Sequence, residues 1–513
     1  MRRILVALCS CAGLNKEGAD RIRQALEGRF PGVVVHPPLP LCQTPSLLAQ
    51  AIREKGADGV VVGACAEAEH HLAFEREAQR ARLAPLALLI VDMEGWTMPT
   101  PKAQVACARA GVILAGAVAR LQAGREPTPN AVRLRLAPLS TPLTRRALFR
   151  LPPVRLQEVA VVESELCAAQ RGCRLCVQVC PYQALETADD TLMVLRERCE
   201  GCGLCVPACP TGAIDLSATS LPALRAQVDA LLTFPEAHLP HRAIAFTCPC
   251  RPLPPGNALP PSVLPVAVPC LGLLTLDIPL RAVGMGATGI ALPEPSSCPH
   301  QSAQVVRERV QLLGNLLEAL GIGRERLAVL PADAQAQKDA LRRLANLPPS
   351  APLDAVPAGD LPTLLLALSR RAGVSVRMGH PASPLGIVEV SGACTLCGSC
   401  ATVCPPSALL LHQGDREATL SFHSHRCTAC GMCAPACPEG AIALWRGVDT
   451  ACLAQGMRVV ARTPQALCRS CGRPFMPLAL VKKVQTVLAQ QGIPNLEAFT
   501  TLCPDCRGFP TAR

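Results

Sequence analysis

The sequence predicts a multidomain protein that combines α/β and α+β folds. Two regions alternate apolar strands with amphipathic helices, which is typical of small parallel α/β domains. Two other regions carry dense, regularly spaced cysteines between short apolar runs, and another cysteine-rich stretch ends the sequence. With 513 residues and 50% hydrophobic content, there is ample material for three or more hydrophobic cores.

Residues 1–125 are predicted to form the first parallel α/β domain. Its expected strands are Ile4–Leu8, Val33–His36, Gly59–Gly63 and Leu86–Val91. Its expected helices are Lys16–Arg29, Ser46–Lys55, Glu67–Arg82 and Lys102–Gln122. The first three strands are each followed by cysteine, namely Cys9, Cys11, Cys42 and Cys65. Because ligands gather at the carboxyl ends of parallel strands, these thiols are predicted to form one cluster site; buried small hydrophobes are the alternative.

Thirty cysteines are the outlier of the composition. They cluster at the spacing of metal ligands, whereas disulfide-rich proteins are small and carry a signal peptide. The opening MRRILVALCSC has an apolar core too short for such a signal, and no apolar run approaches the roughly 20 residues of a spanning helix. We therefore expect a protein of the reducing cytoplasm, without direct insertion into a membrane.

After a predicted linker at 126–154, residues 155–217 carry two copies of a cysteine motif. The run CEGCGLCVPACP from Cys199 has the form C-x2-C-x2-C-x3-C-P, which wraps three thiolates around one [4Fe–4S] cluster and sends the fourth to a neighbour. The run CAAQRGCRLCVQVCP from Cys167 has three extra residues, which can bulge without removing a ligand. We expect a ferredoxin-like module with two clusters, one on Cys167, Cys173, Cys176 and Cys209 and the other on Cys199, Cys202, Cys205 and Cys180.

Residues 387–446 repeat this pattern without an insertion, after a second predicted linker at 351–386. The runs are CTLCGSCATVCP and CTACGMCAPACP. The same crossing predicts one cluster on Cys394, Cys397, Cys400 and Cys437 and another on Cys427, Cys430, Cys433 and Cys404. Paired zinc sites are the alternative, but zinc does not require the C-x3-C-P ending four times.

A connecting helix is expected within 218–241, and residues 242–350 then repeat the alternation of the first α/β domain. Cysteines again follow the first three predicted strands, namely Cys248, Cys250, Cys270 and Cys298. They are predicted to form a second strand-end site, with His300 as the reserve ligand. GMGATG at Gly284–Gly289 matches a dinucleotide fingerprint but lies between a helix and a strand, the reverse of the required order. We therefore expect no flavin.

Residues 447–513 form a predicted zinc-ribbon-like tail. Two C-x2-C knuckles, Cys468 with Cys471 and Cys503 with Cys506, flank an expected helix in MPLALVKKVQTVLAQQG. Four cysteines in this arrangement suit a tetrahedral zinc ion. A rubredoxin-like iron site is the alternative, although that fold has no long central helix. Cys107 and Cys452 are expected to be buried thiols outside any site.

The formal net charge of +11 counts every cysteine as neutral. A four-thiolate iron–sulfur or zinc site carries about −2, so five [4Fe–4S] clusters, one [2Fe–2S] cluster and one zinc would bring the total to roughly −3. Aromatic residues make up only 2% of the chain and offer few stacking platforms for single strands. The basic residues thus offset metal centres, and no nucleic-acid partner is expected.

Two families share particular stretches with this chain. LCSC, the isolated Cys42 and VVVGACAEAEHHLAFERE resemble the N-terminal domain of the heterodisulfide reductase A subunit, without that family's flavin domain. This resemblance implies a non-standard [4Fe–4S] cluster at the first strand-end site. FTCPC, VPCLG, GATGIAL and LLEALGIGRERL resemble the delta subunit of methyl-viologen-reducing hydrogenase, which implies a [2Fe–2S] cluster and docking to hydrogenase or formate dehydrogenase modules. The chain departs from that family in its C-x-C pair and its single cysteine near Cys298.

Every strong motif is a ligand set, and no acid–base pair is apparent, so no catalytic residue is predicted. The main hypothesis is an electron-transfer subunit of a hetero-oligomeric, anaerobic oxidoreductase complex. It would relay single electrons between a hydrogenase, formate dehydrogenase or heterodisulfide-reductase-like partner and another acceptor. The alternatives are a reductase acting on a disulfide or other small substrate at a strand-end cluster, and a redox-sensing regulatory or assembly protein.

Overall fold

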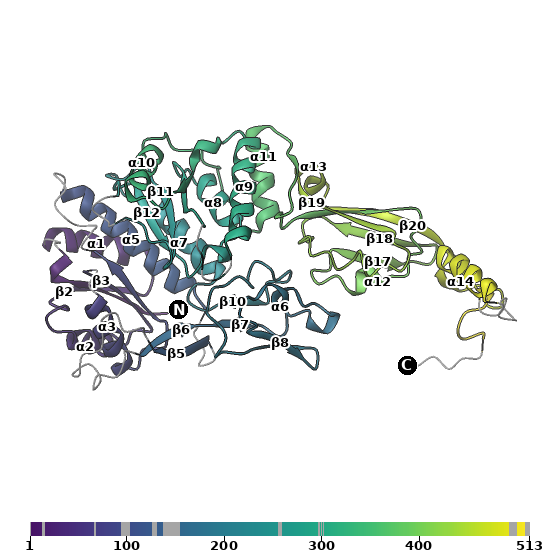
Figure 1. Ribbon diagram of the computed structural model, residues 1–513, viewed down its shortest axis with the longest axis horizontal. Helices are drawn as coiled ribbons and strands as arrows, with labels where there is room; N and C mark the ends of the chain where they lie inside the picture. The colour runs from purple at the N-terminus through teal and green to yellow at the C-terminus, as the bar shows by residue number, and fades with distance from the viewer. Residues whose placement is uncertain are drawn as a thin grey trace. The chain divides into compact units, whose positions relative to one another are not determined.

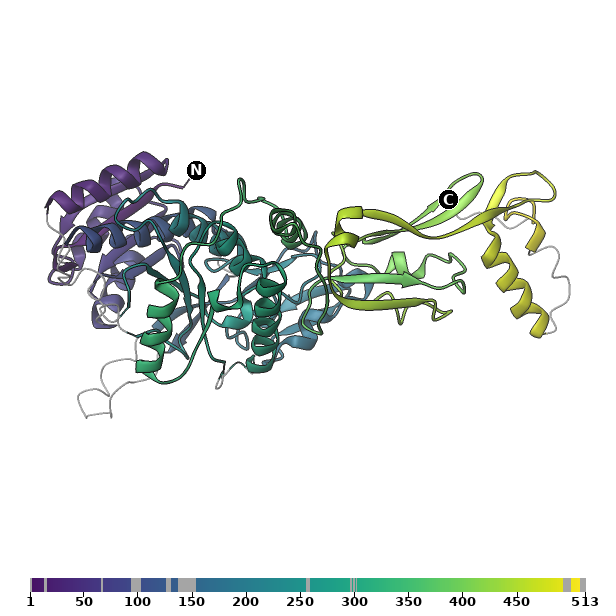
Figure 2. The ribbon, with the colours of Figure 1, turned by 90° about the horizontal axis from the view of Figure 1, so that it is seen from above.

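The fold is that of a computed structural model, which describes residues 2–12, 16–65, 68–93, 103–125, 131–136, 154–254, 259–295, 298, 300, 302–491 and 500–507. The chain divides into two compact units, which are described separately below (Figures 1 and 2). Unit 1 comprises Met1–Glu165, Cys176–Ala188 and Leu192–Leu368. Unit 2 comprises Leu166–Leu175, Asp189–Thr191 and Ser369–Arg513.

The first sheet of unit 1 is parallel and has the strand order β2-β1-β3-β4. Its strands are β1 (Ile4–Cys9), β2 (Val33–Leu39), β3 (Gly59–Ala64) and β4 (Leu88–Asp92). The helices are α1 (Lys16–Arg29), α2 (Ser46–Lys55), α3 (Ala68–Arg80) and α5 (Ala103–Ala123), with a short η1 (Ser10–Ala12) after β1. Helices α2 and α3 cover one face and α1 and α5 the other, so every residue of the central β1 and β3 is buried. These elements agree with the strands and helices predicted from the sequence.

The second sheet of unit 1 has the equivalent order, β12-β11-β13-β14, and is also parallel. Its strands are β11 (Ala243–Thr247), β12 (Val263–Ala267), β13 (Ile290–Pro293) and β14 (Leu327–Leu330). The helical elements around it are α7 (Leu221–Thr233), η6 (Leu271–Leu273), α8 (Asp277–Gly284), α9 (Ala303–Ala319), η7 (Arg324–Arg326), α10 (Ala334–Ala345) and α11 (Leu361–Ala372). Gly284–Gly289 lies between α8 and β13, which is the helix-then-strand order expected for GMGATG.

Helix α5 joins the two sheets of unit 1. By length and composition Gln104–Ala123 could cross a membrane, which the sequence analysis had not expected, but 83% of this segment is buried inside the protein. The helix packs against α7, where a Cβ on Gly116 would lie 2.8 Å from the Leu231 side chain, so glycine permits the close approach. Two buried arginines of α5, Arg109 and Arg120, each donate to a carbonyl oxygen of the edge strand β12 at 2.9 Å. The edge strand is thereby covered and its carbonyls are satisfied.

The first cysteine-motif region contains short elements around its loops. They are β5 (Val132–Leu136), β6 (Val154–Glu158), β7 (Ala160–Val162), η4 (Ala169–Arg171), α6 (Leu175–Val179), β8 (Leu185–Ala188), β9 (Thr191–Val194) and β10 (Ile214–Leu216). Strand β7 pairs with β10, and β5 pairs with β6, both antiparallel. The predicted linker 126–154 therefore contains a strand, β5, which was not predicted because the surrounding sequence is rich in Pro and Arg.

Unit 2 is built on antiparallel strands (Figure 2). Its strands are β15 (Arg377–Gly379), β16 (Gly386–Val390), β17 (Leu409–Gln413), β18 (Glu417–His423), β19 (Ile442–Asp449), β20 (Met457–Leu467) and β21 (Pro474–Pro477), and its helices are α12 (Ser399–Thr402), α13 (Thr450–Gln455) and α14 (Leu478–Gln490). One sheet has the order β17-β18-β20-β21 and another the order β15-β19-β16. The tail thus contributes β20 to the same sheet as the cysteine-motif region, and β19 continues across position 446/447, where the sequence predicted a boundary.

Candidate iron–sulfur and metal centres

Four thiols of the first α/β domain lie together at the carboxyl edge of its sheet. Cys9 ends β1, Cys11 lies in η1, and Cys42 and Cys65 follow β2 and β3. The Sγ atom of Cys42 lies 3.4 Å from that of Cys9, 3.2 Å from that of Cys11 and 3.2 Å from that of Cys65. Parallel strands end at one edge, and the crossover from β2 to β3 opens a crevice there. The structure therefore brings the four predicted residues together through Cys42, which lies in one group with Cys9 and Cys11 and in another with Cys65.

A histidine that was not predicted as a site residue also lies beside these thiols. His70, in the first turn of α3, has its Nδ1 atom 3.1 Å from Cys65 Sγ. Its neighbour His71 has Nε2 3.2 Å from the carbonyl oxygen of Cys65. The only signal in the sequence is the His-His pair shortly after Cys65 in the third strand-to-helix connection. His70 is a further candidate ligand or hydrogen-bond donor for this site.

The second strand-end site consists of two thiol pairs. The Sγ atoms of Cys248 and Cys250 are 3.6 Å apart, and those of Cys270 and Cys298 are 3.8 Å apart. Burial, followed by the neighbouring thiols Cys248 and Cys298, raises the pKa of Cys250 to about 12. The four predicted ligands are thus found as two close pairs.

Ser302, which the sequence analysis did not single out, contacts one of these pairs. Its Oγ atom lies 3.1 Å from Cys270 Sγ and 3.0 Å from Cys298 Sγ. Both Ser302 and Cys270 are 1% exposed, so water does not compete for these hydrogen bonds. His300, the reserve ligand, instead has its Nδ1 atom 2.6 Å from the hydroxyl of Tyr182.

The first ferredoxin-like region has a cavity where one cluster was predicted. Four predicted ligands line it: Cys180, Cys199, Cys202 and Cys205. Burial, together with the charges of Cys199 and Cys180, raises the pKa of Cys202 to about 11. Several thiols with raised pKa values are suited to binding iron, because the positive charge of the metal offsets the repulsion between neighbouring thiolates.

The other predicted set of this region is divided between the two units. Cys167 and Cys173 flank η4, which contains part of the insertion and is closed by Gly172 at φ +80°. Cys176 lies in α6, and Cys209 lies in the loop before β10. The insertion is thus a short helical turn, and a shared cluster for these four remains a sequence prediction.

In unit 2 the cysteines of each predicted set lie near one another. One cavity is lined by Cys404, Cys427, Cys430 and Cys433. For the other set, burial together with the nearby charges of Cys394, Cys397, Cys433 and Cys437 raises the pKa of Cys400 to about 12. The crossing of the fourth cysteine between neighbouring motifs is consistent with both observations.

All four motif copies end in the same turn, which accounts for the shared C-P-x-x-A ending. The third residue after the last cysteine has a positive φ in every copy: Gln183 (49°), Gly212 (69°), Ser407 (52°) and Gly440 (58°). The next residue, always alanine, donates its N–H to the cysteine Sγ at 3.2 to 3.4 Å, in Ala184, Ala213, Ala408 and Ala441. Such N–H···S bonds favour the thiolate and influence a cluster's reduction potential.

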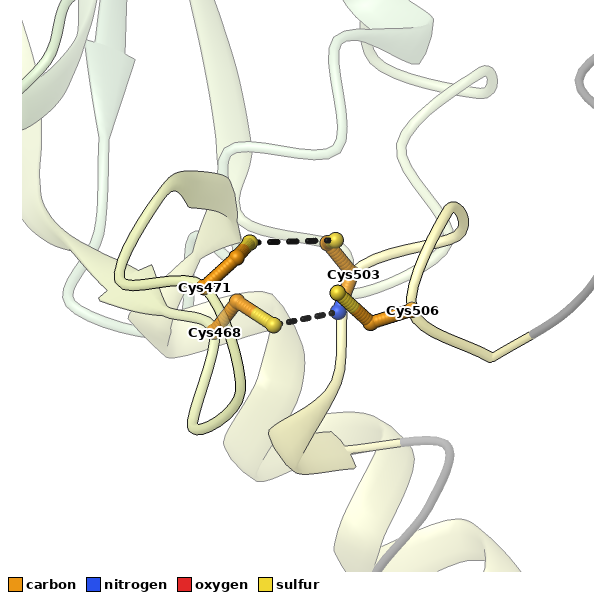
Figure 3. Close-up of side chains that lie close together, drawn as sticks. All are labelled: Cys468, Cys471, Cys503 and Cys506. Atoms are coloured by element: carbon orange, nitrogen blue, oxygen red, sulfur yellow. Dashed lines mark hydrogen bonds between the residues drawn. The ribbon is translucent and has the colours of Figure 1, made fainter.

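The four cysteines of the tail form a compact group (Figure 3). Cys468 and Cys471 lie in the turn between β20 and β21, while Cys503 and Cys506 lie beyond α14. Their Sγ atoms are within 4.8 Å of one another, and Cys471 and Cys503 are 3.7 Å apart, close to the roughly 3.8 Å edge of a tetrahedron with Zn–S bonds of about 2.3 Å. The N–H of Cys503 donates to Cys468 Sγ at 3.3 Å, and this bond, together with hydrogen bonds from Cys471 and Ser470, lowers the pKa of that thiol to about 6. This donor set fits a single tetrahedral ion.

The two unassigned thiols are buried, as predicted: Cys107 is 9% exposed and Cys452 is 8% exposed. The Sγ of Cys107 lies 3.5 Å from the carbonyl oxygen of Gly18, and no metal-ligand group found among the described residues includes either thiol. Both pKa values are raised by burial, as for inert core cysteines.

Comparison with family models gives two matches. Residues 158–214 and 393–441 both match the 4Fe-4S dicluster domain. Residues 255–347 match the delta subunit of methyl-viologen-reducing hydrogenase. No curated protein matches the chain. The protein thus carries two 4Fe-4S dicluster domains and a hydrogenase delta-subunit-like domain, which support an iron–sulfur electron-transfer subunit of a hydrogenase-like or other oxidoreductase complex.

Proposed function

We propose that this chain relays single electrons within a hetero-oligomeric oxidoreductase complex, between a hydrogenase, formate dehydrogenase or heterodisulfide-reductase-like partner and another acceptor. The observation that carries the proposal is the combination of two dicluster domains with a delta-subunit-like domain on one polypeptide. Iron–sulfur clusters accept and release one electron at a time without breaking protein bonds. A chain of ligand sets without an acid–base pair is suited to conduction rather than bond chemistry.

The proposed ligand sets follow the cysteine groups described above. The two dicluster domains would hold four [4Fe–4S] clusters, with the fourth cysteine of each motif crossing to the neighbouring cluster. The strand-end site of the first α/β domain would hold a fifth, as the resemblance to heterodisulfide reductase A implies, and the second strand-end site a [2Fe–2S] cluster. The tail would hold structural zinc, which stabilises the fold around it.

The metal and labile-sulfide content of anaerobically purified full-length protein tests this assignment. Five [4Fe–4S] clusters and one [2Fe–2S] cluster give about 22 irons per chain, and the tail gives about one zinc. About 16 irons would mean that only the dicluster domains are loaded and that both strand-end assignments are wrong. Iron-free protein that remains folded, or a tightly bound flavin, would overturn the proposed function.

A second candidate function is favoured by one observation at the first strand-end site. Cys11 is exposed, and His70 lies 3.1 Å from Cys65, so a thiol and a proton-carrying ring are combined at this accessible edge. A reductase acting on a disulfide or other small substrate would need such access. Turnover of a disulfide by the purified chain with an artificial electron donor would support this candidate, and conduction without turnover would support the relay.

A further inference from the structure

A buried contact joins the second strand-end site to the first dicluster domain within unit 1. Cys202, Leu204 and Cys270 form one buried cluster, and Tyr182 and Cys298 pack against it. Two of these residues are predicted ligands of the second strand-end site, and Cys202 is a predicted ligand of a ferredoxin-like cluster. Ligands of two different sites therefore share one small apolar core.

The two loops approach each other as closely as glycine allows. A Cβ on Gly272 would lie 2.5 Å from Cδ2 of Leu204, and a Cβ on Gly203 would lie 2.8 Å from Cδ1 of Leu273. The side chain of Arg309, in α9, donates to the carbonyl oxygen of Gly272 at 2.7 Å and holds this loop from behind. At these two points a leucine side chain of one loop is in direct contact with the backbone of the other.

One hydrogen bond crosses this contact. The hydroxyl of Tyr182 and Nδ1 of His300 are 2.6 Å apart, and their rings meet edge to face with centroids 5.8 Å apart. Tyr182 stands two residues after Cys180, and His300 stands two residues after Cys298. The bond therefore links the segments that carry a predicted ligand of each site.

Cluster binding by the cysteine motif does not require this tyrosine. The other three copies have Thr211, Pro406 and Glu439 at the equivalent position, directly after the proline. Tyr182 is the single tyrosine of the whole chain. Tyr182 occurs only in the motif copy that contacts the second strand-end site. This placement indicates that its hydroxyl serves that contact.

We propose that Tyr182 and His300 are positioning residues that hold the second strand-end site against the ferredoxin-like cluster of Cys180, Cys199, Cys202 and Cys205, so that these two centres exchange electrons directly. This inference rests on the proposed function. One electron leaves one cluster, which is oxidised, and enters the other, which is reduced. No proton is transferred, and no covalent bond is formed or broken. The protein's part is to fix the distance between the two centres and to exclude water from the space between them.

Electron paramagnetic resonance of the reduced, metal-loaded full-length protein tests the pairing. The signal of the second strand-end site is identified as the one lost in Cys270→Ala. Cys202→Ala should leave that signal present but make it narrower and easier to saturate, because its paramagnetic neighbour is lost or altered. The matched variant Cys430→Ala, at the equivalent position of the other dicluster domain, should leave its width and saturation unchanged. If Cys202→Ala does not fold, Cys202→Ser serves the same comparison.

The positioning role is tested with Tyr182→Phe, which keeps the ring and removes the hydroxyl. Loss of one neutral hydrogen bond should raise the ratio of separated to docked contacts roughly five-fold. Electron exchange between the two centres should slow in proportion to the docked fraction that is lost. His300→Ala should have the same effect, while His300→Asn, which retains a polar atom near the Nδ1 position, should restore much of it. Glu439→Gln, at the equivalent motif position, should have no effect on this exchange.

The outcomes distinguish failure of the pairing or of the positioning role from failure of the proposed function. An unchanged strand-end signal in Cys202→Ala would overturn the pairing, and wild-type exchange in Tyr182→Phe would overturn the positioning role, while the proposed function stands in both cases. Absence of any signal that Cys270→Ala removes, together with about 20 irons or fewer per chain, would instead overturn the assignment of the second strand-end site, and the pairing with it.

Discussion

The two parallel α/β domains of unit 1 have the same plan and different sites. Both sheets place their first strand beside the second and third, and both carry a C-x-C pair after the first strand and a cysteine after each of the next two. In the first domain, Cys42 lies within 3.4 Å of three other thiols. In the second, the sulfurs form two pairs at 3.6 and 3.8 Å, and Ser302 contacts one of them.

The comparison shows that the sheet topology determines where the thiols gather, whereas the surrounding loops and elements determine the environment of each site. The parallel direction of the strands determines that the thiols meet at one edge, because parallel strands end on the same side of a sheet. The loops and the surrounding elements then determine the detail. The first site lies beside His70 and has an exposed thiol, Cys11, whereas the second is packed against a dicluster domain and none of its four thiols is exposed. We infer that the first edge is open to an exchange partner and that the second is an internal relay.

The largest expected effect comes from removing the central thiol of the first site. Cys42→Ala should lower the iron content by about four per chain, because three remaining thiols no longer complete a [4Fe–4S] ligand set. Iron and labile-sulfide analysis of the anaerobic protein measures the change, and Cys107→Ala provides the control, as a buried thiol outside any site. Unchanged iron in Cys42→Ala would show that this edge does not hold a cluster and that the two domains differ more than proposed.

A smaller loss is expected from the equivalent change in the second domain. Cys270→Ala should remove about two irons per chain, since the resemblance to the hydrogenase delta subunit implies a [2Fe–2S] cluster there. The same metal analysis, combined with the lost resonance signal, measures the result. A loss of about four irons would make the two sites equal in nuclearity and would remove this part of the comparison.

The smallest effect should come from the Ser302 hydroxyl of the second site. Ser302→Ala removes a donor to the thiolates, and since hydrogen bonds to sulfur favour the more negative, reduced cluster, its reduction potential should fall. A tenfold change in the equilibrium constant corresponds to about 59 mV for one electron, which we take as the expected scale. Potentiometric titration measures it, and Ser302→Thr, which keeps the hydroxyl, should stay near the wild-type value. An unchanged potential in Ser302→Ala would show that the hydroxyl does not act on the cluster.

Periodicity and motif spacing were sufficient for much of the architecture. The helices Lys16–Arg29 and Ser46–Lys55 were predicted to the residue, because apolar positions recur at helical spacing and Gly56 ends the second at φ 57°. The tail was harder to delimit. Strand β20 pairs with β18 of the preceding region, and pairing between strands separated in sequence leaves no local signal.

The polar neighbours of the sites were only partly visible in the sequence. Cys298 and Cys65 lie four and five residues before Ser302 and His70, but the contact of Ser302 with Cys270 spans 32 residues and leaves no local signal. The tyrosine at position 182 was visible as an exception among four motif copies, yet its partner lies 118 residues away. Contacts of this range are decided by packing.

The sequence by itself determined which residues are available to bind metal, because thiolate spacing along the backbone limits what one turn can wrap around. It also determined on which edge of each sheet the isolated cysteines emerge, since strands that alternate with helices run parallel and end on the same edge. Only the tertiary structure decided which sites adjoin one another. The contact of Cys202 with Cys270 depends on two loops with glycine at the point of closest approach, and burial of this kind is a property of the packed chain.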